Sequence, residues 1–355
     1  MKSILKQAAG IDVAKNELVV CLGRMDQEVT IELFAHKNFE NSKKGFDLLI
    51  KWVGKMFSSE MPVRFVMEAT GVYHESFAYF LIDKGQEVSI VLPNKISSYF
   101  RTLDVKTETD KTASEAIARF GLERKLDLWK KPKELFKQLK QLTSERVQII
   151  DERTVLKNQI HAEKNEAFPN QSSLKRMKIR LAILEKQDDE IQAELRILIK
   201  KDSEVQKLVA LLCTIPGIGI LTAATVLGET NGFDLIRNKR QITSYAGLDV
   251  KQKDSGTSVH KKPRISKRGN KHLRKALHMS ALCSIRCNDN SKAIFVRLVS
   301  RNGIKMQAVV AVQRRLLELM FILYKTQKPY DKNFNNSQTK VIIIEEELKE
   351  ELELT

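Results

Sequence analysis

One short segment combines a candidate nucleophile with a dense set of positive charges. Ser255 precedes Gly256, and no acidic residue occurs from Ser255 to Lys275. Eight basic residues follow the serine: Lys261, Lys262, Arg264, Lys267, Arg268, Lys271, Arg274 and Lys275. A serine hydroxyl here could attack a phosphate while the basic side chains hold the polyanion. Gly256 and Gly269 would let the backbone turn close to a bulky ligand. By itself the segment fits a solvated basic loop equally well.

Three acidic residues stand at the ends of predicted elements. Asp12 follows Gly10 and Ile11 in an apolar stretch, Glu68 ends the strand in 62–70, and Asp110 begins a helix that ends near Gly121. Carboxylates that meet at one place bind hard divalent cations, and two such ions can clamp the attacking and leaving oxygens of a phosphodiester. Each acid alone would be an ordinary surface residue or helix cap. Their shared placement at element ends favours a metal site.

The elements around these acids predict an α/β domain over residues 1–130. Apolar strands are expected at 8–23, 28–35, 62–70 and 87–92, with helices at 42–57 and from Gly71 onward. This β-β-α-β-α-β order indicates a mixed sheet with helices packed against it.

Residues 131–204 predict a long antiparallel helical hairpin or coiled coil. Two stretches, 134–166 and the one after the break at 168–173, carry apolar residues at heptad spacing. Arg146 and Arg153 interrupt the first seam, and Asp188 interrupts the second. The hairpin is either an intramolecular spacer or a dimerising arm, and the two narrow apolar stripes favour the arm.

Residues 205–330 predict a separate, mainly helical domain. The run Ile215-Pro216-Gly217-Ile218-Gly219 fits a helix-hairpin-helix motif, in which Gly217 and Gly219 let backbone N–H groups approach a phosphate. A plain tight turn between helices is the alternative. Further helices are expected at 271–287 and 304–324, followed by a linker and acidic tail over 331–355. The tail could be a helix or a strand.

The whole chain is strongly basic. Its 355 residues carry a formal net charge of +17, although the last fifteen residues contain six glutamates and one lysine. This charge attracts polyanions and makes nucleic acid the expected partner. No membrane span and no signal peptide are recognised, so a cytoplasmic protein is expected. The four cysteines form no CxxC pair and are expected to be buried free thiols.

Several ordered motifs resemble one family of enzymes. GIDVAKNE, FVMEATGVYHESFAYFL and KTETDKTASEAIARFG look like the RuvC-like (RNase H-like) N-terminal domain of the DEDD insertion-sequence transposases, the one-ten/eleven-eleven family. IPGIG, SYAGL before Ser255, RISKRGNKHLRKAL and NGIKMQAVVAVQRRLLELMFILY look like its C-terminal transposase domain. The resemblance extends from about residue 8 to residue 330. It implies an RNA-guided recombinase that pairs a bridge RNA with donor and target DNA.

The resemblance also implies roles for individual residues. Asp12, Glu68 and Asp110 would be ligands of Mg²⁺ (or Mn²⁺), and Ser255 would be the nucleophile. The family pattern has a second Asp three residues after Asp110, but this chain has Ala113 there. An i,i+3 pair would put both carboxylates on one helix face. The alanine suggests an inactivated form, engineered or natural.

The expected function is therefore DNA strand exchange through a covalent phosphoserine intermediate. The basic residues Lys261, Lys262, Arg264, Lys267, Arg268, Lys271 and Arg274 would hold backbone phosphates, which position nucleic acid without specifying sequence. A dimer that pairs into a tetramer on two DNAs, associated with a bacterial nucleoid, is expected. Two alternatives remain: a RuvC-like junction nuclease in which water attacks, and a non-catalytic nucleic-acid-binding protein.

Overall fold

The computed structural model describes residues 3–57, 61–69, 71–103, 105, 107, 109–234, 236–255 and 259–332, with side chains described at all of these except 252–255 and 259–263. The chain divides into two compact units, Met1–Lys131 and Pro132–Thr355. Within the described ranges, no helix has the length and apolarity needed to cross a membrane. The predicted acidic tail at 341–355 and Gly256 lie outside these residues.

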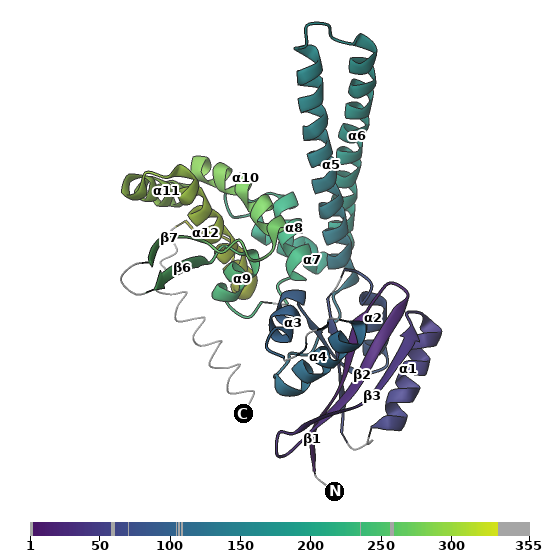
Figure 1. Cartoon of the computed structure of the whole chain (residues 1–355). Helices are drawn as coiled ribbons and strands as arrows, with labels where there is room; N and C mark the ends of the chain where they lie inside the picture. Colours follow the sequence, from purple (N-terminus) through teal and green to yellow (C-terminus); the bar gives the residue numbers. More distant parts are fainter. Residues whose placement is uncertain are drawn as a thin grey trace. The chain divides into compact units, whose positions relative to one another are not determined.

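A five-stranded mixed sheet, ordered β3-β2-β1-β4-β5, forms the centre of the first unit. Figure 1 labels its strands β1, β2 and β3. Its strands are β1 (Ile4–Val13), β2 (Glu17–Asp26), β3 (Ile31–Glu40), β4 (Val63–Glu68) and β5 (Glu87–Val91). The pairs β1–β2 and β2–β3 are antiparallel, whereas β1–β4 and β4–β5 are parallel. The predicted α/β domain with a mixed sheet is confirmed.

Helices cover both faces of this sheet. On one face, α1 (Lys43–Met56) and α2 (Glu75–Asp83) pack Phe46, Leu49 and Phe77 against odd-numbered residues of β1. On the other face lie α3 (Pro93–Phe100) and α4 (Asp110–Glu123). Because side chains alternate along a strand, the even-numbered residues of β1, including Asp12, face α4.

The stretch 8–23, predicted as one strand, is instead an antiparallel hairpin. The chain reverses at 14–16, where the Ala14 N–H donates to the Glu17 carbonyl (2.9 Å), and Ile11 then lies opposite Val20. The prediction was wrong because Asp12 and Lys15 were taken as a break within one strand, whereas residues 14–16 are the turn between two strands. Helix α3 was also missed, since Pro93 was taken only as the end of a strand, whereas proline suits a first helical turn.

The second unit begins with two 31-residue helices, α5 (Glu134–Lys164) and α6 (Gln171–Lys201), which form the predicted antiparallel hairpin (Figure 1). The residues that interrupt the two seams meet one another. Asp188, 6% exposed, lies 2.7 Å from Arg146 and 3.7 Å from Arg153. The three charges meet only in one alignment of the helices, so the ion triad favours a single register.

The remainder of the second unit is mainly helical, with one small sheet. Its elements are α7 (Ser203–Leu212), α8 (Ile220–Thr230), α9 (Lys239–Ala246), β6 (Val250–Ser255), β7 (Val259–Ile265), α10 (Lys271–Cys287), α11 (Asp289–Asn302) and α12 (Lys305–Thr326). Helix α10 matches its predicted bounds, and the β6–β7 hairpin was not predicted. The cysteine prediction was partly wrong: Cys21 is buried, but Cys283 and Cys287 are exposed.

Candidate catalytic and nucleic-acid site

The sheet places two of the predicted acids on neighbouring strands. Ile11 of β1 lies opposite Met67 of the parallel strand β4, so Asp12 and Glu68 are the next residues along each strand. Glu68 is the last residue of β4, and Asp12 is the last but one of β1. The predicted placement at strand ends is therefore present.

Helix α4 brings the third acid to the same edge. A Cβ on Gly10 would meet the backbone of Ser114 and Ala118 and would lie 2.6 Å from Ala118 Cα, so only glycine allows α4 to lie this close to β1. Asp110, the first residue of the helix, lies one turn before Ser114 on this face. Thr109 fixes the helix start, since its side chain accepts a hydrogen bond from the Thr112 N–H (3.2 Å).

The electrostatics of Asp12 show that the three carboxylates interact. Burial, and after it the negative charges of Asp110 and Glu68, together raise the pKa of Asp12 to about 6, although a hydrogen bond from the Val13 backbone lowers it. A carboxylate destabilised by two others is the electrostatic setting that a bound cation relieves.

The carboxylates do not form a complete metal cage, however. Among the described residues, no group of three His, Cys, Asp or Glu side chains is arranged to hold a metal ion. Neither of the described polar neighbours replaces the acid missing at Ala113: Glu115 pairs with His36 at 2.9 Å, and the Ser114 hydroxyl donates to the Lys111 carbonyl at 2.7 Å. The site thus supplies oxygen ligands of the type that hard divalent cations prefer, close enough to interact electrostatically.

Ser255 lies at the end of a β-hairpin in the second unit. It is the last residue of β6 and lies opposite Val259, the first residue of β7. The base of the hairpin is held by backbone contacts: Ser266 N–H donates to the Asp249 carbonyl (2.8 Å), and Asn270 N–H donates to the Tyr245 carbonyl (2.7 Å). The backbone position of the candidate nucleophile is therefore at the end of a two-stranded hairpin whose base is held by backbone hydrogen bonds.

The predicted phosphate-binding residues differ in their surroundings. Arg264, Lys267, Arg268 and Lys271 are exposed, whereas the side chains of Lys261 and Lys262 lie outside the described part. Arg274 instead donates to the carbonyls of Ala246 (2.7 Å) and Gly269 (3.1 Å). Gly269 likewise packs closely on the Tyr245–Gly247 backbone. Arg274 and Gly269 therefore stabilise the loops at the base of the β6–β7 hairpin. The sequence did not suggest this structural role.

The two glycines of the predicted helix-hairpin-helix differ in environment. Gly217 has φ +96°, and a Cβ there would lie 2.7 Å from the Ser280 carbonyl oxygen and the Ser284 nitrogen, so it allows α10 to approach. Gly219, the N-cap of α8, has open space around its Cβ position. Both line a pocket of about 530 Å³ beside Arg196. Gly217 thus has a role in helix packing. Phosphate binding by the backbone at Gly217 and Gly219 stays a prediction.

Sequence reasoning missed one buried acid near the basic segment. Glu229 is 4% exposed, accepts a hydrogen bond from the Asn270 side chain (2.7 Å) and lies 3.6 Å from Lys140. Asn270 caps α10, since its side chain accepts from the His272 and Leu273 N–H groups. Glu229 thereby anchors the start of the helix that carries the last basic residues. The sequence does contain a signal for Glu229, because this acid ends the otherwise apolar run 220–229.

Comparison with known proteins assigns the class. A family model named for DEDD transposases of the IS110 type, described as "Transposase", matches residues 9–169, and one described as "Transposase IS116/IS110/IS902 family" matches residues 209–295. The two matches cover both units, including the strand-end acids and Ser255, and define a DNA recombination enzyme of the transposase class. The chain belongs to the IS110 family of DEDD transposases.

Relatives extend over nearly the whole chain. The pilin gene-inverting protein of Moraxella lacunata is 28% identical over 342 residues, covering 93% of this chain and 99% of that protein. Its Moraxella bovis counterpart is 28% identical over 339 residues, with the same coverage. An uncharacterized insertion element IS110 protein of Streptomyces coelicolor is 26% identical, covering 42% of this chain and 36% of that protein. Among solved structures, Thermus thermophilus RuvC with a Holliday junction substrate is 11% identical, covering 35% of this chain and 99% of that chain, with a TM-score of 0.27.

Proposed function

We propose that this transposase cuts and exchanges DNA strands with the acids of the first unit and the serine of the second. The observation that supports this most directly is geometric: the adjacent parallel strands β1 and β4 carry Asp12 and Glu68 at one edge of the sheet, and α4, which begins at Asp110, packs on β1 at Gly10. Carboxylates that repel one another in a recombination enzyme are suited to Mg²⁺ or Mn²⁺, which would stabilise charge on a reacting phosphate.

The chemistry assigned to Ser255 has two steps. In the first, the serine oxygen attacks a DNA phosphorus, forming a phosphoserine bond and breaking the bond to the 3′-oxygen, which takes up a proton. In the second, the 3′-hydroxyl of another strand attacks the phosphoserine, restores a phosphodiester and releases the serine, which regains a proton. The exposed cations Arg264, Lys267, Arg268 and Lys271 would hold the strand by its phosphates.

Trapping a covalent protein–DNA adduct tests this assignment. The chain is incubated with labelled DNA from the ends of its element, and the adduct is resolved on a denaturing gel. An adduct that Ser255→Ala abolishes supports the serine mechanism, whereas cleavage that survives Ser255→Ala shows water to be the nucleophile, as in a junction nuclease. Ser244→Ala, in α9 of the same unit, is the matched control.

The two halves of the site would come from different subunits of a dimer or tetramer. Purified Ser255→Ala and Glu68→Ala chains, each inactive alone, should recover cleavage when mixed, because each supplies the half that the other lacks. No recovery at any mixing ratio would contradict a shared site. Bridge-RNA guidance is tested separately, by sequencing RNA that copurifies with the chain and matching it to DNA flanking its gene.

A second function is supported by Ala113. With one acid missing and no metal-binding cluster among the described residues, the chain as it stands would bind nucleic acid without efficient cleavage. Ala113→Asp should raise Mg²⁺-dependent cleavage by about tenfold or more, because the new carboxylate completes the clamp. Equal, robust cleavage by both chains would refute the idea of an inactivated copy. Salt-sensitive binding without cleavage by either would establish the non-catalytic alternative.

A further inference from the structure

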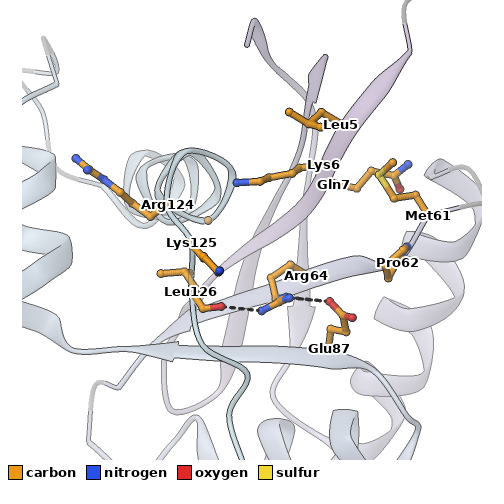
Figure 2. A pocket seen from close by; sticks show the side chains of 11 residues that line it. Leu5, Lys6, Gln7, Met61, Pro62, Arg64, Glu87, Arg124, Lys125 and Leu126 are labelled. Carbon is orange, nitrogen blue, oxygen red and sulfur yellow. Dashed lines mark hydrogen bonds and ion pairs between the residues drawn. The ribbon is translucent and has the colours of Figure 1, made fainter. Parts of the chain in front are cut away.

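Side chains fasten the starts of the parallel strands β1 and β4 in the first unit. Arg64, near the start of β4, donates to the Leu126 carbonyl (3.2 Å) and lies 2.9 Å from Glu87 of β5 (Figure 2). Lys6 of β1 donates to the Leu122 carbonyl near the end of α4 (2.9 Å). These contacts join both strands to the chain at the end of α4, so this end of the sheet has links in addition to the backbone ladder.

At the opposite end of the sheet, the acids lie just beyond the pairing of their two strands. The ladder between β1 and β4 stops at Ile11 and Met67, and Asp12 and Glu68 are the next residues. Each acid is still paired on its other side, Asp12 with β2 and Glu68 with β5. The separation between the two acids therefore depends on what joins the loops that follow them.

One side-chain amide joins these two loops. Asn41 follows β3, and its Nδ2 donates to the carbonyl of Ala14 (2.9 Å), two residues after Asp12. The same nitrogen donates to the carbonyl of Tyr73 (3.3 Å), in the turn that follows Glu68. A side-chain amide has two N–H donors, so one can serve each carbonyl. Asn41 thus bridges the loop after β1 and the loop after β4.

The position of Asn41 is itself fixed by the backbone. Its N–H donates to the Asn16 carbonyl in the turn between β1 and β2 (2.9 Å). The next residue, Ser42, caps α1, since its side chain accepts from the Gly45 N–H (3.3 Å). A substitution of the Asn41 side chain leaves both bonds in place, so it removes the bridge while the fold is retained.

We propose that Asn41 is a positioning residue that sets the separation of Asp12 and Glu68 for a divalent cation. This inference rests on the proposed function, in which those carboxylates bind Mg²⁺ or Mn²⁺. Asn41 acts through the backbone of the two loops, because its side-chain donors are engaged with carbonyl oxygens. Groups that orient metal ligands typically contribute roughly 10- to 100-fold to metal affinity, and a link through the backbone should lie at the lower end of this range.

Direct measurement of Mn²⁺ binding tests this role without requiring cleavage. Loss of the free Mn²⁺ signal in electron paramagnetic resonance, measured with the full chain, gives the dissociation constant. Asn41→Ala should raise this constant by about tenfold. The matched control is Asn38→Ala, because Asn38 of β3 donates to the Glu17 side chain (2.8 Å) and joins no loop; it should leave the constant unchanged. Unchanged Mn²⁺ binding by the Asn41→Ala chain would overturn the proposal.

A double-mutant cycle separates positioning from a general effect of the substitution. Asp12→Asn replaces one of the carboxylates that Asn41 is proposed to position. In that background Asn41→Ala should change the Mn²⁺ dissociation constant by less than about threefold, because residues that act on one site are not additive. The same tenfold loss in both backgrounds would show that Asn41 acts elsewhere and would overturn the proposal.

The outcomes also distinguish this inference from the proposed function. If Asp12→Asn does not weaken Mn²⁺ binding, both the metal site and the positioning role are refuted. If Asn41→Ala weakens Mn²⁺ binding tenfold but no Ser255-dependent adduct forms, the positioning role is supported and the serine mechanism is refuted. If the adduct forms and Asn41→Ala leaves Mn²⁺ binding unchanged, only the positioning role is refuted.

Discussion

Mg²⁺ should bind this protein more weakly at pH 5 than at pH 7, with the change centred near the pKa of Asp12. Burial, Asp110 and Glu68 together raise that pKa to about 6. At pH 7 about 90% of Asp12 is ionised, and at pH 5 about 10% is, so the apparent dissociation constant should rise by about tenfold. The proton and the cation compete for the same carboxylate.

Thermal unfolding with and without 10 mM Mg²⁺ measures this competition. For a dissociation constant of about 1 mM at pH 7, the ion would stabilise the folded state by about 1.4 kcal/mol at pH 7 and about 0.4 kcal/mol at pH 5. Asp12→Asn should remove most of the stabilisation at both pH values, because an amide is a poorer ligand. Equal stabilisation at pH 5 and pH 7, or full stabilisation of the Asp12→Asn chain, would refute the reasoning.

Without Mg²⁺, the folded protein should become less stable, not more stable, as the pH rises. Because the folded state holds the Asp12 proton more tightly than the unfolded chain does, the free energy of unfolding should fall as pH rises from about 4 through about 6. Asp12→Asn should flatten this part of the pH profile, which urea unfolding at several pH values would reveal. An unaltered profile would show that Asp12 does not titrate in this window.

Two further substitutions test the packing that supports the site and the arm. Gly10→Ala should destabilise the first unit by about 1–3 kcal/mol in urea unfolding, because its methyl group meets α4, whereas the control Gly54→Ala, with open space around it, should be neutral or slightly stabilising. Asp188→Ala should destabilise the hairpin by about 2 kcal/mol, less than for a fully buried pair because Arg146 and Arg153 are about a quarter exposed. Replacing all three charges by leucine should recover that loss; no recovery would show that the triad contributes more than the apolar seam.

The placement of Asp12 and Glu68 at the ends of strands could be predicted from the sequence because it follows from local patterns. Asp12 and Glu68 end apolar runs, and parallel strands bring such ends to one edge of a sheet. The close approach of α4 at Gly10 could not be anticipated, since a glycine within a strand gives no direction in which a helix will lie.

Interactions between distant residues were the least predictable. In the sequence, Arg146 and Asp188 only interrupt two apolar heptad patterns. The structure shows that the antiparallel alignment of the helices pairs them. Gln7 read as an ordinary polar residue of a strand, and nothing local showed that its side chain is buried without a partner. In both cases the sequence shows a polar residue in an apolar context but not what it meets.

The length of the α5–α6 hairpin can change without disturbing the rest of the unit. Beyond the triad, the arm has its own apolar cluster around Leu156, Ile160 and Leu174, separate from the core of the unit. Seven residues inserted into each helix of this outer part would keep the seam in phase and lengthen the arm by about 10.5 Å, whereas other insertions would rotate the seam. Arm length in this architecture can therefore change in whole heptads while the serine-bearing domain stays the same.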